Sequence, residues 1–241
     1  MLRKPIPLWI IAGGFALTLI GGCINAVGFL SLYHQALSHM SGTLCALGFN
    51  LATEPAPVVW HSLRVLVSFF FGALLSGFIL RQSTLKAGRR YGVTLAVESA
   101  LLFAAVHAFR VNSVWGVYFA AAACGLQNAM ASSYSGTVIR TTHVTGMVTD
   151  LGIACGHMLR RQPVEWRRFK LYAALMTGFF AGSYMGAVSF VRIGYDTLLF
   201  PAALAGATGL GYAIFKHIER RQFQRSEQAA LRDLPRAPDP L

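Results

Sequence analysis

The chain has 241 residues, of which 55% are hydrophobic and 12% are charged. Soluble domains carry about 25% charged residues, so the composition argues against an ordinary water-soluble enzyme, and the high hydrophobicity excludes an intrinsically disordered chain. The charges are unequal, because 21 Lys and Arg face 9 Asp and Glu and give a formal net charge of +12. A basic chain binds nucleic acid only if its basic residues cluster on a polar face.

Six apolar stretches follow one another along the chain, each close to the roughly 20 residues that a transmembrane helix needs. They are apolar on every side and lack the polar face of a surface helix. We therefore predict an all-α polytopic membrane protein with six transmembrane helices at residues 8–32, 62–80, 92–109, 114–133, 171–191 and 197–215. Small residues at helical spacing, Gly178, Gly182 and Gly186 and also Ala73 and Gly77, predict close packing between these helices.

The basic residues occupy alternate connections between the predicted spans. They cluster before the first span, at 81–90, at 160–170 and after the sixth span, whereas the other connections hold single arginines such as Arg110. Loops rich in Lys and Arg stay in the cytoplasm, so we predict that both termini are cytoplasmic. An eight-span alternative, in which 41–52 and 145–159 also cross, would place the 81–90 cluster outside and is rejected. The net charge therefore indicates topology, and no nucleic-acid partner is expected.

The two ends of the chain differ in character. Arg3 and Lys4 precede an apolar run as in a signal peptide, and Ile20-Gly21-Gly22-Cys23 resembles a weak lipoprotein cleavage site. The run continues to Leu32, which favours an uncleaved first span. The segment 218–241 is charged and contains proline, so we expect a short cytoplasmic helix that frays into disorder. Residues 1–217 are predicted to form a single membrane domain.

Four cysteines lie in apolar segments, at Cys23, Cys45, Cys124 and Cys155. None forms a CxxC pair or has a histidine at ligand spacing, so we expect neither a zinc site nor a disulfide framework. We predict that they are buried and pack as small apolar side chains. No metal and no other cofactor is expected.

The two halves of the chain share a polar motif. The first half contains Gly22-x-x-Asn25-Ala26-Val27 and then His39-x-Ser41-Gly42-x4-Leu47-Gly48, and the second contains Gly125-x-x-Asn128-Ala129-Met130 and then His143-x-Thr145-Gly146-x4-Leu151-Gly152. The offset is 103 residues at the asparagines and 104 from the histidines onward, and Arg64 and Arg168 also keep the offset of 104. We interpret this as a duplication, with repeat A at about 8–110 and repeat B at about 114–217.

Each repeat contains three predicted spans, and this odd number predicts that the second repeat is inverted in the membrane. Inverted repeats are frequent in channels and secondary transporters, whose sites near the midplane are built from broken helices. The polar runs 38–43 and 140–146 each precede a short apolar segment. We expect two re-entrant half-helices entering from opposite faces, with Ser41 and Thr145 as N-caps. Their positively polarised N-termini would suit an anion or a polar neutral solute.

The motifs of the second half resemble the signature of the YoaK family of bacterial integral membrane proteins, which are grouped under a domain of unknown function. The motifs are Gly125-Leu126-Gln127-Asn128-Ala129, Arg140-Thr141-Thr142-His143-Val144-Thr145-Gly146 and Asp150-Leu151-Gly152, with Ser38-His39-Met40-Ser41-Gly42 in the first half. The resemblance covers roughly residues 8–217 and implies a bacterial inner-membrane location and about six spans, without an established substrate. The family commonly has an acidic residue at the position of Asn25 and an asparagine at that of Thr43. The resemblance therefore carries no proton-coupling or solute-binding role over to these two positions.

The candidate solute-binding residues are polar side chains in or beside the duplicated motif. They are Asn25, His39, Ser41, Asn128, Arg140, His143, Thr145 and Asp150, and the candidates for proton coupling are Glu98 and Asp150. Carboxylates within apolar helices are costly and usually face a cavity or a partner. The structural alternatives are an interfacial anchor for Asp150, braces for the histidines, interhelical hydrogen bonds for the asparagines and a salt bridge to an arginine for Glu98. The motif glycines Gly42, Gly48, Gly146 and Gly152 are interpreted as close-packing positions.

The common enzyme signatures are absent from the sequence, with no nucleotide-binding Gly-rich loop, HExxH or Gly-x-Ser-x-Gly element, and no enzymatic activity is expected. We expect a small-solute transporter or channel whose midplane site is formed by the two His-x-Ser/Thr-Gly half-helices. Its partners would be membrane lipid and a small polar or anionic solute, and the sequence specifies no oligomeric state. The alternatives are a non-transporting membrane scaffold and a membrane-embedded enzyme acting on lipid.

Overall fold

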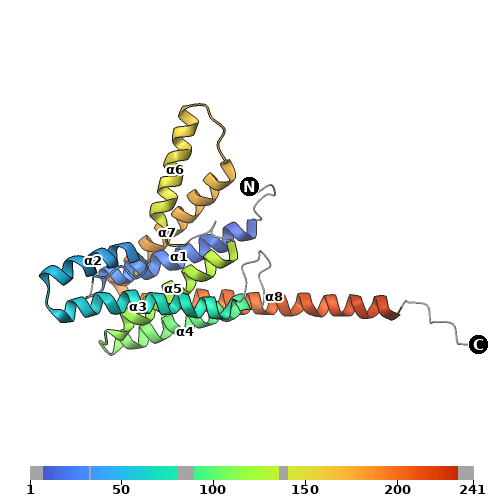
Figure 1. The fold of residues 1–241 in the computed structure, drawn as a ribbon. Helices are drawn as coiled ribbons and strands as arrows, with labels where there is room; N and C mark the ends of the chain where they lie inside the picture. Colours follow the sequence, from blue (N-terminus) through green and yellow to red (C-terminus); the bar gives the residue numbers. More distant parts are fainter. Residues whose placement is uncertain (1–7, 33, 81–89, 136–140, 233–241) are drawn as a thin grey trace, which may run out of the picture.

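The computed structural model describes residues 8–32, 34–80, 90–135 and 141–232, and every regular element in this part of the chain is a helix (Figure 1). The elements are α1 (Leu8–Leu30), α2 (Met40–Thr53), α3 (Ala56–Ile79), α4 (Arg90–Arg110), α5 (Trp115–Ser135), α6 (Val144–Leu159), α7 (Trp166–Ile193), the 3-10 helix η1 (Gly194–Leu198) and α8 (Leu199–Arg232). The predicted all-α class is confirmed.

Six of these helices contain the predicted spans, and the other two are the short helices α2 and α6. Among the described residues, four stretches are long and apolar enough to cross a bilayer: Ile11–Leu30, Ala56–Ile79, Arg90–Arg110 and Trp166–Phe215, the last of which takes in α7, η1 and the first half of α8. The fold is therefore that of a helical membrane protein. The number of crossings stays a prediction.

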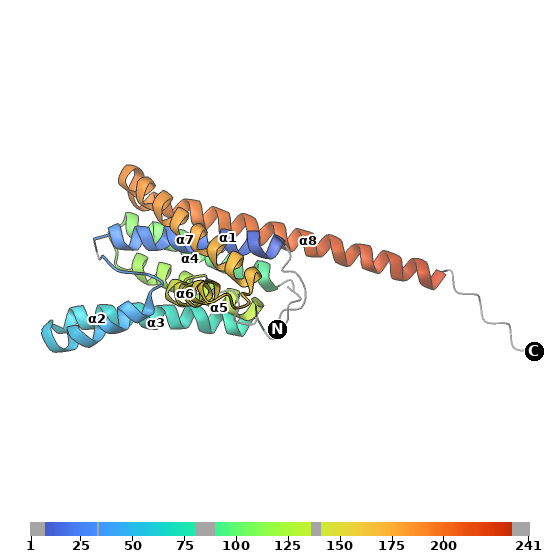
Figure 2. The same ribbon diagram turned by 90° about the horizontal axis from the view of Figure 1, so that it is seen from above.

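The last span and the tail form one helix, which differs from the prediction. A span ending at 215 and a separate short helix were expected, whereas α8 continues without a break to Arg232 (Figure 2). Residues 233–241, where fraying was expected, lie outside the described residues.

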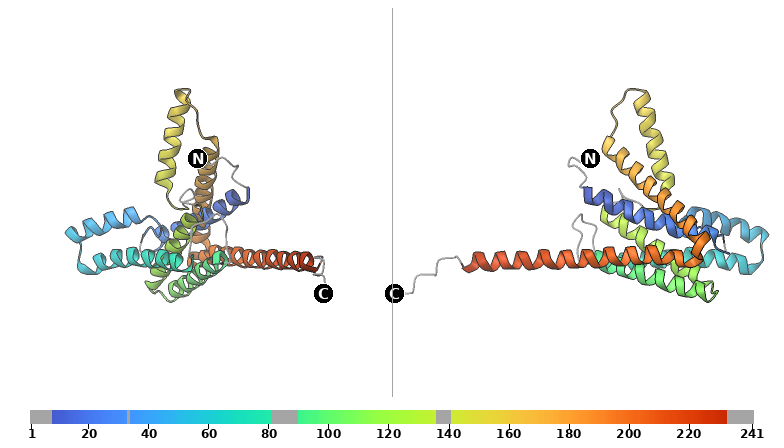
Figure 3. Two further views of the ribbon diagram at one scale, coloured as in Figure 1. Left: turned by 45° about the vertical axis from the view of Figure 1, so that its right-hand side comes forward. Right: turned by 180° about the vertical axis from the view of Figure 1, so that it is seen from behind.

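The two short helices have few neighbours. With 14 and 16 residues they are about 21 and 24 Å long, less than the roughly 30 Å of a bilayer core. Within the described ranges, α2 contacts only α3 among the helices, and α6 contacts only α7. Figures 1 and 3 show α2 lying along α3, whereas α6 projects away from the bundle.

The N-caps of the short helices are not the predicted residues. Each helix begins one residue after a histidine, so His39 and His143 occupy the cap positions, and neither makes a side-chain capping hydrogen bond. Ser41 and Thr145 lie inside the first turn and are exposed.

Helices α1 and α7 pack in parallel along a row of glycines. A Cβ atom at Gly178 would lie 3.0 Å from the carbonyl oxygen of Phe15, one at Gly182 would lie 2.8 Å from the Cα of Leu19, and one at Gly186 would lie 2.9 Å from the Cα of Cys23. The contacts advance together along both helices, which makes them parallel. The close packing predicted for these three glycines is confirmed.

Helices α3 and α5 repeat the same crossing. In the first pair, Cβ atoms at Gly22 and Gly182 would each overlap the backbone of the other helix, at Phe179 and Leu19. In the second pair, Cβ atoms at Gly125 and Gly72 would overlap the backbone at Phe69 and Ala122. Gly22 corresponds to Gly125 at the predicted offset of 103, but Gly72 corresponds to Gly182 at an offset of 110. The equivalence predicted for Arg64 and Arg168 at an offset of 104 is therefore wrong.

Other predicted close-packing glycines face open space. A Cβ atom at Gly77 would have no neighbour within 4 Å, and the same holds for the motif glycines Gly42, Gly48, Gly146 and Gly152. The predictions for these five residues are wrong. The motif glycines lie on α2 and α6, each of which has one helical neighbour among the described residues.

Helix α4 packs against both α5 and α8. It packs antiparallel to α8, where Ser99 donates a 2.8 Å hydrogen bond to the carbonyl oxygen of Ala202 and where Gly92 and Gly209 approach closely. It also forms an antiparallel hairpin with α5, in which the Tyr91 hydroxyl donates to the carbonyl oxygen of Met130 over 2.8 Å.

The turn η1 gathers helix ends at one side of the bundle. The Tyr195 ring stacks on Phe109 at the end of α4 with 4.3 Å between centroids, and Asp196 accepts a 2.8 Å hydrogen bond from Arg110. The carboxyl ends of α1, α4 and α7 lie here together with the first residues of α5 and α8. A contact between His61 and Tyr118 brings the start of α3 to the same side. Successive long helices therefore alternate in direction.

Candidate functional site

The loop that precedes α2 is held inside the bundle by Asn25. The Oδ1 atom of Asn25 accepts hydrogen bonds from the backbone amides of Leu37 and Ser38, at 3.0 and 3.1 Å, and its Nδ2 atom donates to the Ser38 hydroxyl. All three residues are buried. The chain thus leaves α1, turns back into the bundle and begins α2 from a buried position.

Asn128 has the corresponding contact in the second half. Its Oδ1 atom accepts a 3.4 Å hydrogen bond from the Thr141 hydroxyl, across the same 13 residues that separate Asn25 from Ser38. Thr141 is fully buried. The sequence also allowed hydrogen bonds from the two asparagines to other helices. In the structure each asparagine instead bonds to residues that precede the short helix of its own half.

Two polar side chains near this loop were missed in the sequence. The Gln127 side chain is fully buried and Thr142 is 5% exposed. Their Oε1 and Oγ1 atoms have no hydrogen-bond partner among the described residues. One signal was available in the sequence, because Thr142 is the extra residue that changes the repeat offset from 103 to 104.

The duplicated histidines have different surroundings. The His39 ring lies edge-on to Phe179, with 5.8 Å between centroids, and its Nδ1 atom is buried without a hydrogen-bond partner among the described residues. His143 is exposed. Thr145 is also exposed, and its carbonyl oxygen accepts a hydrogen bond from Thr149. Arg140 lies outside the described residues.

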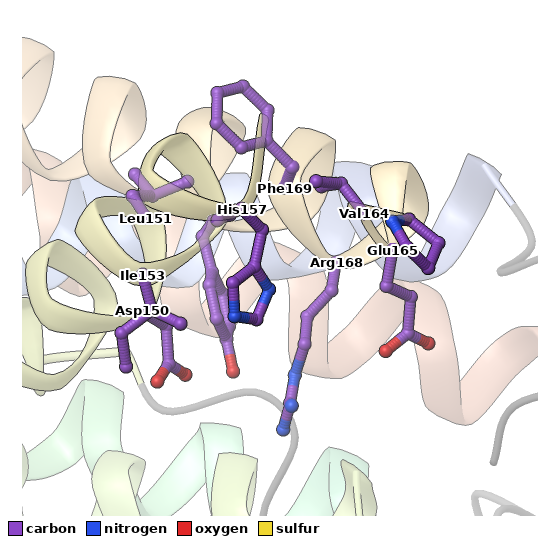
Figure 4. A pocket seen from close by; sticks show the side chains of 11 residues that line it. Asp150, Leu151, Ile153, His157, Val164, Glu165, Arg168 and Phe169 are labelled. Carbon is purple, nitrogen blue, oxygen red and sulfur yellow. The ribbon is translucent and has the colours of Figure 1, made fainter. Parts of the chain in front are cut away.

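Asp150 lines a pocket between α6 and α7 of about 260 Å³ (Figure 4). Tyr172 interacts there with both Asp150 and Arg168, and the Arg168 guanidinium lies 5.7 Å from the centre of the Tyr172 ring. Figure 4 also shows His157 and Glu165 at this pocket. Its lining includes neither His39 nor His143. The structure thus places Asp150 apart from the loops that Asn25 and Asn128 hold.

Glu98 is enclosed by the bundle core. Its side chain is fully buried on α4 and lies close enough to Cys124 of α5 for the two to interact electrostatically. Neither carboxylate oxygen has a hydrogen-bond partner in the described part of the chain. The alternative of a salt bridge to an arginine is not found among those residues.

Two of the four cysteines are buried as predicted. Cys23 and Cys124 are buried, but Cys45 and Cys155 are exposed, because they lie on the sparsely packed α2 and α6. All four are free thiols. The described residues contain no group of three His, Cys, Asp or Glu side chains that could hold a metal ion.

Comparison with known proteins gives one match. The family model described as "Protein of unknown function (DUF1275)" matches residues 13–211. No curated protein and no solved structure matches the chain.

Proposed function

The chain belongs to the DUF1275 family, of which YoaK is a member, and from this premise we propose that it is a small-solute transporter or channel of the bacterial inner membrane. It crosses the bilayer six times with both termini in the cytoplasm. Repeat B is inverted relative to repeat A, and the solute site lies where the loops before α2 and α6 enter the bundle.

The packing of the long helices supports the inverted arrangement. The parallel pair of α1 and α7 corresponds to the parallel pair of α5 and α3, with the same reciprocal glycine contacts at Gly22, Gly182, Gly125 and Gly72. A twofold axis in the membrane plane would exchange these pairs and would exchange α4 with its antiparallel neighbour α8. Inverted repeats of this kind recur in secondary transporters.

The observation that carries the proposal is the pair of buried residues that precedes each short helix, Leu37 and Ser38 before α2 and Thr141 and Thr142 before α6. Irregular backbone at membrane depth is tolerated only where it is buried in protein or lines a water-filled cavity. A scaffold needs no such loops, since uninterrupted helices satisfy their backbone groups at lower cost. Two loops held by asparagines at equivalent positions favour a site that the backbone helps to build.

The topology is tested by cysteine labelling in spheroplasts. With the exposed Cys45 and Cys155 replaced by serine, a membrane-impermeant maleimide should label Asn112→Cys at the α4–α5 turn in intact spheroplasts. It should label Gln162→Cys, between α6 and α7, only after permeabilisation. Labelling of Gln162→Cys in intact spheroplasts would overturn the proposed orientation.

Transport is tested by uptake of a panel of small polar solutes into proteoliposomes. Wild-type protein should give flux above that of protein-free vesicles, and His143→Ala should lower it about tenfold, because it removes a hydrogen-bonding group worth about 1–3 kcal/mol. His107→Ala is the matched control, since His107 is exposed at the end of α4. Background flux from wild type across the panel would favour the scaffold alternative.

Glu98 is proposed to carry a proton if the flux is coupled. A carboxyl group that is fully buried without a hydrogen-bond partner among the described residues is costly when charged, and it suits a group that exchanges a proton. In the same vesicles, Glu98→Gln should abolish uptake driven by a pH gradient and leave downhill exchange intact. Loss of both processes would instead assign Glu98 to packing.

A second candidate function, an enzyme acting on lipid, is favoured by the pocket between α6 and α7. The pocket brings together Asp150, His157, Glu165 and Arg168, which include general acid–base groups and a cation for a phosphate. Phosphorus NMR of vesicles containing the protein measures headgroup release. Release that Asp150→Asn abolishes, without solute uptake, would replace the transport proposal.

A further inference from the structure

The short helix of the first half is bonded directly to the long helix that follows it. The Nδ2 atom of Asn50 on α2 donates a 3.1 Å hydrogen bond to the hydroxyl of Ser62 on α3, and both residues are buried. Helix α2 accordingly lies along α3 in Figure 1. The first half thus attaches its short helix with side chains of the chain itself.

The second half has a pocket where the first half has this bond. At the offset of 110 found for the long helices, Ser62 corresponds to Tyr172, and at the offset of 104 found for the motif, Asn50 corresponds to Ala154. Tyr172 and Ala154 both line the pocket of about 260 Å³ between α6 and α7. The alanine side chain has no polar atom, so the bond that Asn50 makes in the first half has no counterpart here.

The pocket is lined by charges of both signs. Asp150 belongs to α6, Arg168 to the first turn of α7, and Glu165 immediately precedes α7. In the view of Figure 4, the Arg168 side chain lies between the two carboxylates. None of the three groups forms an ion pair with another described residue. Opposite charges that share a pocket without pairing are available to a ligand that carries both signs.

The surroundings of the pocket favour a lipid over a soluble ion. Trp166, the first residue of α7, is 54% exposed, and tryptophan is enriched where a membrane meets water. Arg168 lies two residues further along the helix, about 3 Å deeper. Ile153 of α6 also lines the pocket and is 53% exposed, so it offers an apolar surface beside the charged groups. This combination places the pocket at the depth of lipid headgroups.

The lining matches a headgroup with two opposite charges. A phosphate pairs with the guanidinium of Arg168, which presents several N–H donors. A primary ammonium donates hydrogen bonds to the carboxylates of Asp150 and Glu165, which would repel a purely anionic headgroup. The pocket has the volume of about nine water molecules at roughly 30 Å³ each, which accommodates such a headgroup without its acyl chains.

We propose that the pocket between α6 and α7 binds a phospholipid whose headgroup carries a phosphate and a primary ammonium group, as in phosphatidylethanolamine. The headgroup joins Asp150 of α6 to Arg168 of α7 and so takes the place of the bond that Asn50 makes in the first half. The bound lipid thereby fixes the angle of α6. The site rests on the proposed function only for its location in the membrane, and the lipid is bound intact, unlike the substrate of the lipid enzyme considered for the same pocket.

The site is tested by native mass spectrometry of the purified full-length protein with added phospholipids of equal chain length. Phosphatidylethanolamine should bind at least about tenfold more tightly than phosphatidylglycerol, which has no ammonium, and phosphatidylcholine, whose quaternary ammonium donates no hydrogen bond. Soluble glycerophosphoethanolamine should bind at least about tenfold more weakly than the lipid, because it has no acyl chains to cover the apolar surface. Equal affinities for the three lipids, equal affinities for the lipid and the soluble headgroup, or a cleaved lipid in the spectrum would each overturn the site.

Removing single charges tests both ends of the headgroup. Arg168→Gln should weaken phosphatidylethanolamine binding about tenfold, and Asp150→Asn should lower the preference for phosphatidylethanolamine over phosphatidylglycerol about tenfold. Lys170→Gln is the matched control, because it removes the same charge from an exposed position of α7 that does not line the pocket. Equal losses in Lys170→Gln and Arg168→Gln would show attraction by net charge and refute the pocket as the site.

Filling the pocket tests the site without changing its charges. Ala154→Leu should lower the affinity for phosphatidylethanolamine about tenfold, whereas Cys155→Leu, at the exposed neighbouring position outside the pocket, should not. Equal affinities of the two variants would overturn the site. The result is separable from transport, because lipid preference without solute flux would refute transport alone, and flux without lipid preference would refute the lipid site alone.

Discussion

Replacing Gly22 with alanine is expected to destabilise the folded protein by about 3 kcal/mol or more. The added methyl group would overlap the carbonyl oxygen of Phe179 and lie 2.9 Å from the amide nitrogen of Ser183 on α7. Backbone atoms cannot swing aside as a side chain can, so α1 and α7 must separate along their whole contact. The measurement is the free energy of unfolding in mixed detergent, titrated with sodium dodecyl sulfate.

The control for Gly22→Ala is Gly13→Ala on the same helix, where a Cβ atom has no neighbour within 4 Å. Alanine favours a helix over glycine by about 1 kcal/mol, so the control should be neutral or slightly stabilising. Gly125→Ala should be as damaging as Gly22→Ala, because it makes the equivalent overlap with Phe69 on α3. Equal stabilities for Gly22→Ala and Gly13→Ala would contradict the helix packing described above.

Replacing Asn25 with leucine is expected to cost about 3 kcal/mol of stability. The substitution keeps the approximate volume but leaves the buried amides of Leu37 and Ser38 without their acceptor. Asn128→Leu is the matched variant in the second half, and it should cost about 1 kcal/mol or less, since the described residues give Asn128 one long bond, to Thr141. The same detergent titration measures both.

The conservative variant Asn25→Asp separates hydrogen bonding from packing. A carboxyl oxygen can accept from the same two amides, so Asn25→Asp should retain most of the stability that Asn25→Leu loses. An Asn25→Asp protein as unstable as Asn25→Leu would show that the amide group itself, rather than its acceptor oxygen, is required.

The helices were predictable because their signals are local. An apolar run of about 20 residues can be recognised without knowing which helix packs against it, so each predicted span coincides for most of its length with one long helix. The close packing along the glycines of α7 could also be predicted, because their spacing of four residues places them on one face of the helix. Gly77 has the same spacing relative to Ala73 yet faces open space, since spacing does not specify whether another helix lies opposite.

The candidate site was less predictable because it depends on how loops fold back. The asparagines were identified from the repeat, but their partners Leu37, Ser38 and Thr141 are set by a chain reversal that no local pattern specifies. Asp150 was placed with them because it follows the same motif, whereas the direction of α6 carries it into a separate pocket. The ends of the short helices were misplaced for a related reason, since histidine at a cap position has no strong propensity signal.

The unequal spacing of the two halves has a mechanical consequence. Helix α2 is joined to α3 through Glu54 and Pro55 alone, whereas residues 160–165 join α6 to α7. This longer connection and the two extra residues of α6 account for the whole shift of the offset from 104 to 110. The two-residue connection holds α2 against α3, whereas the six-residue connection lets α6 lie at a different angle to α7. The two halves therefore share the glycine contacts between their long helices but differ in how tightly the short helix is tethered. We expect a motion that opens one side of the molecule to move α6 while α2 stays fixed.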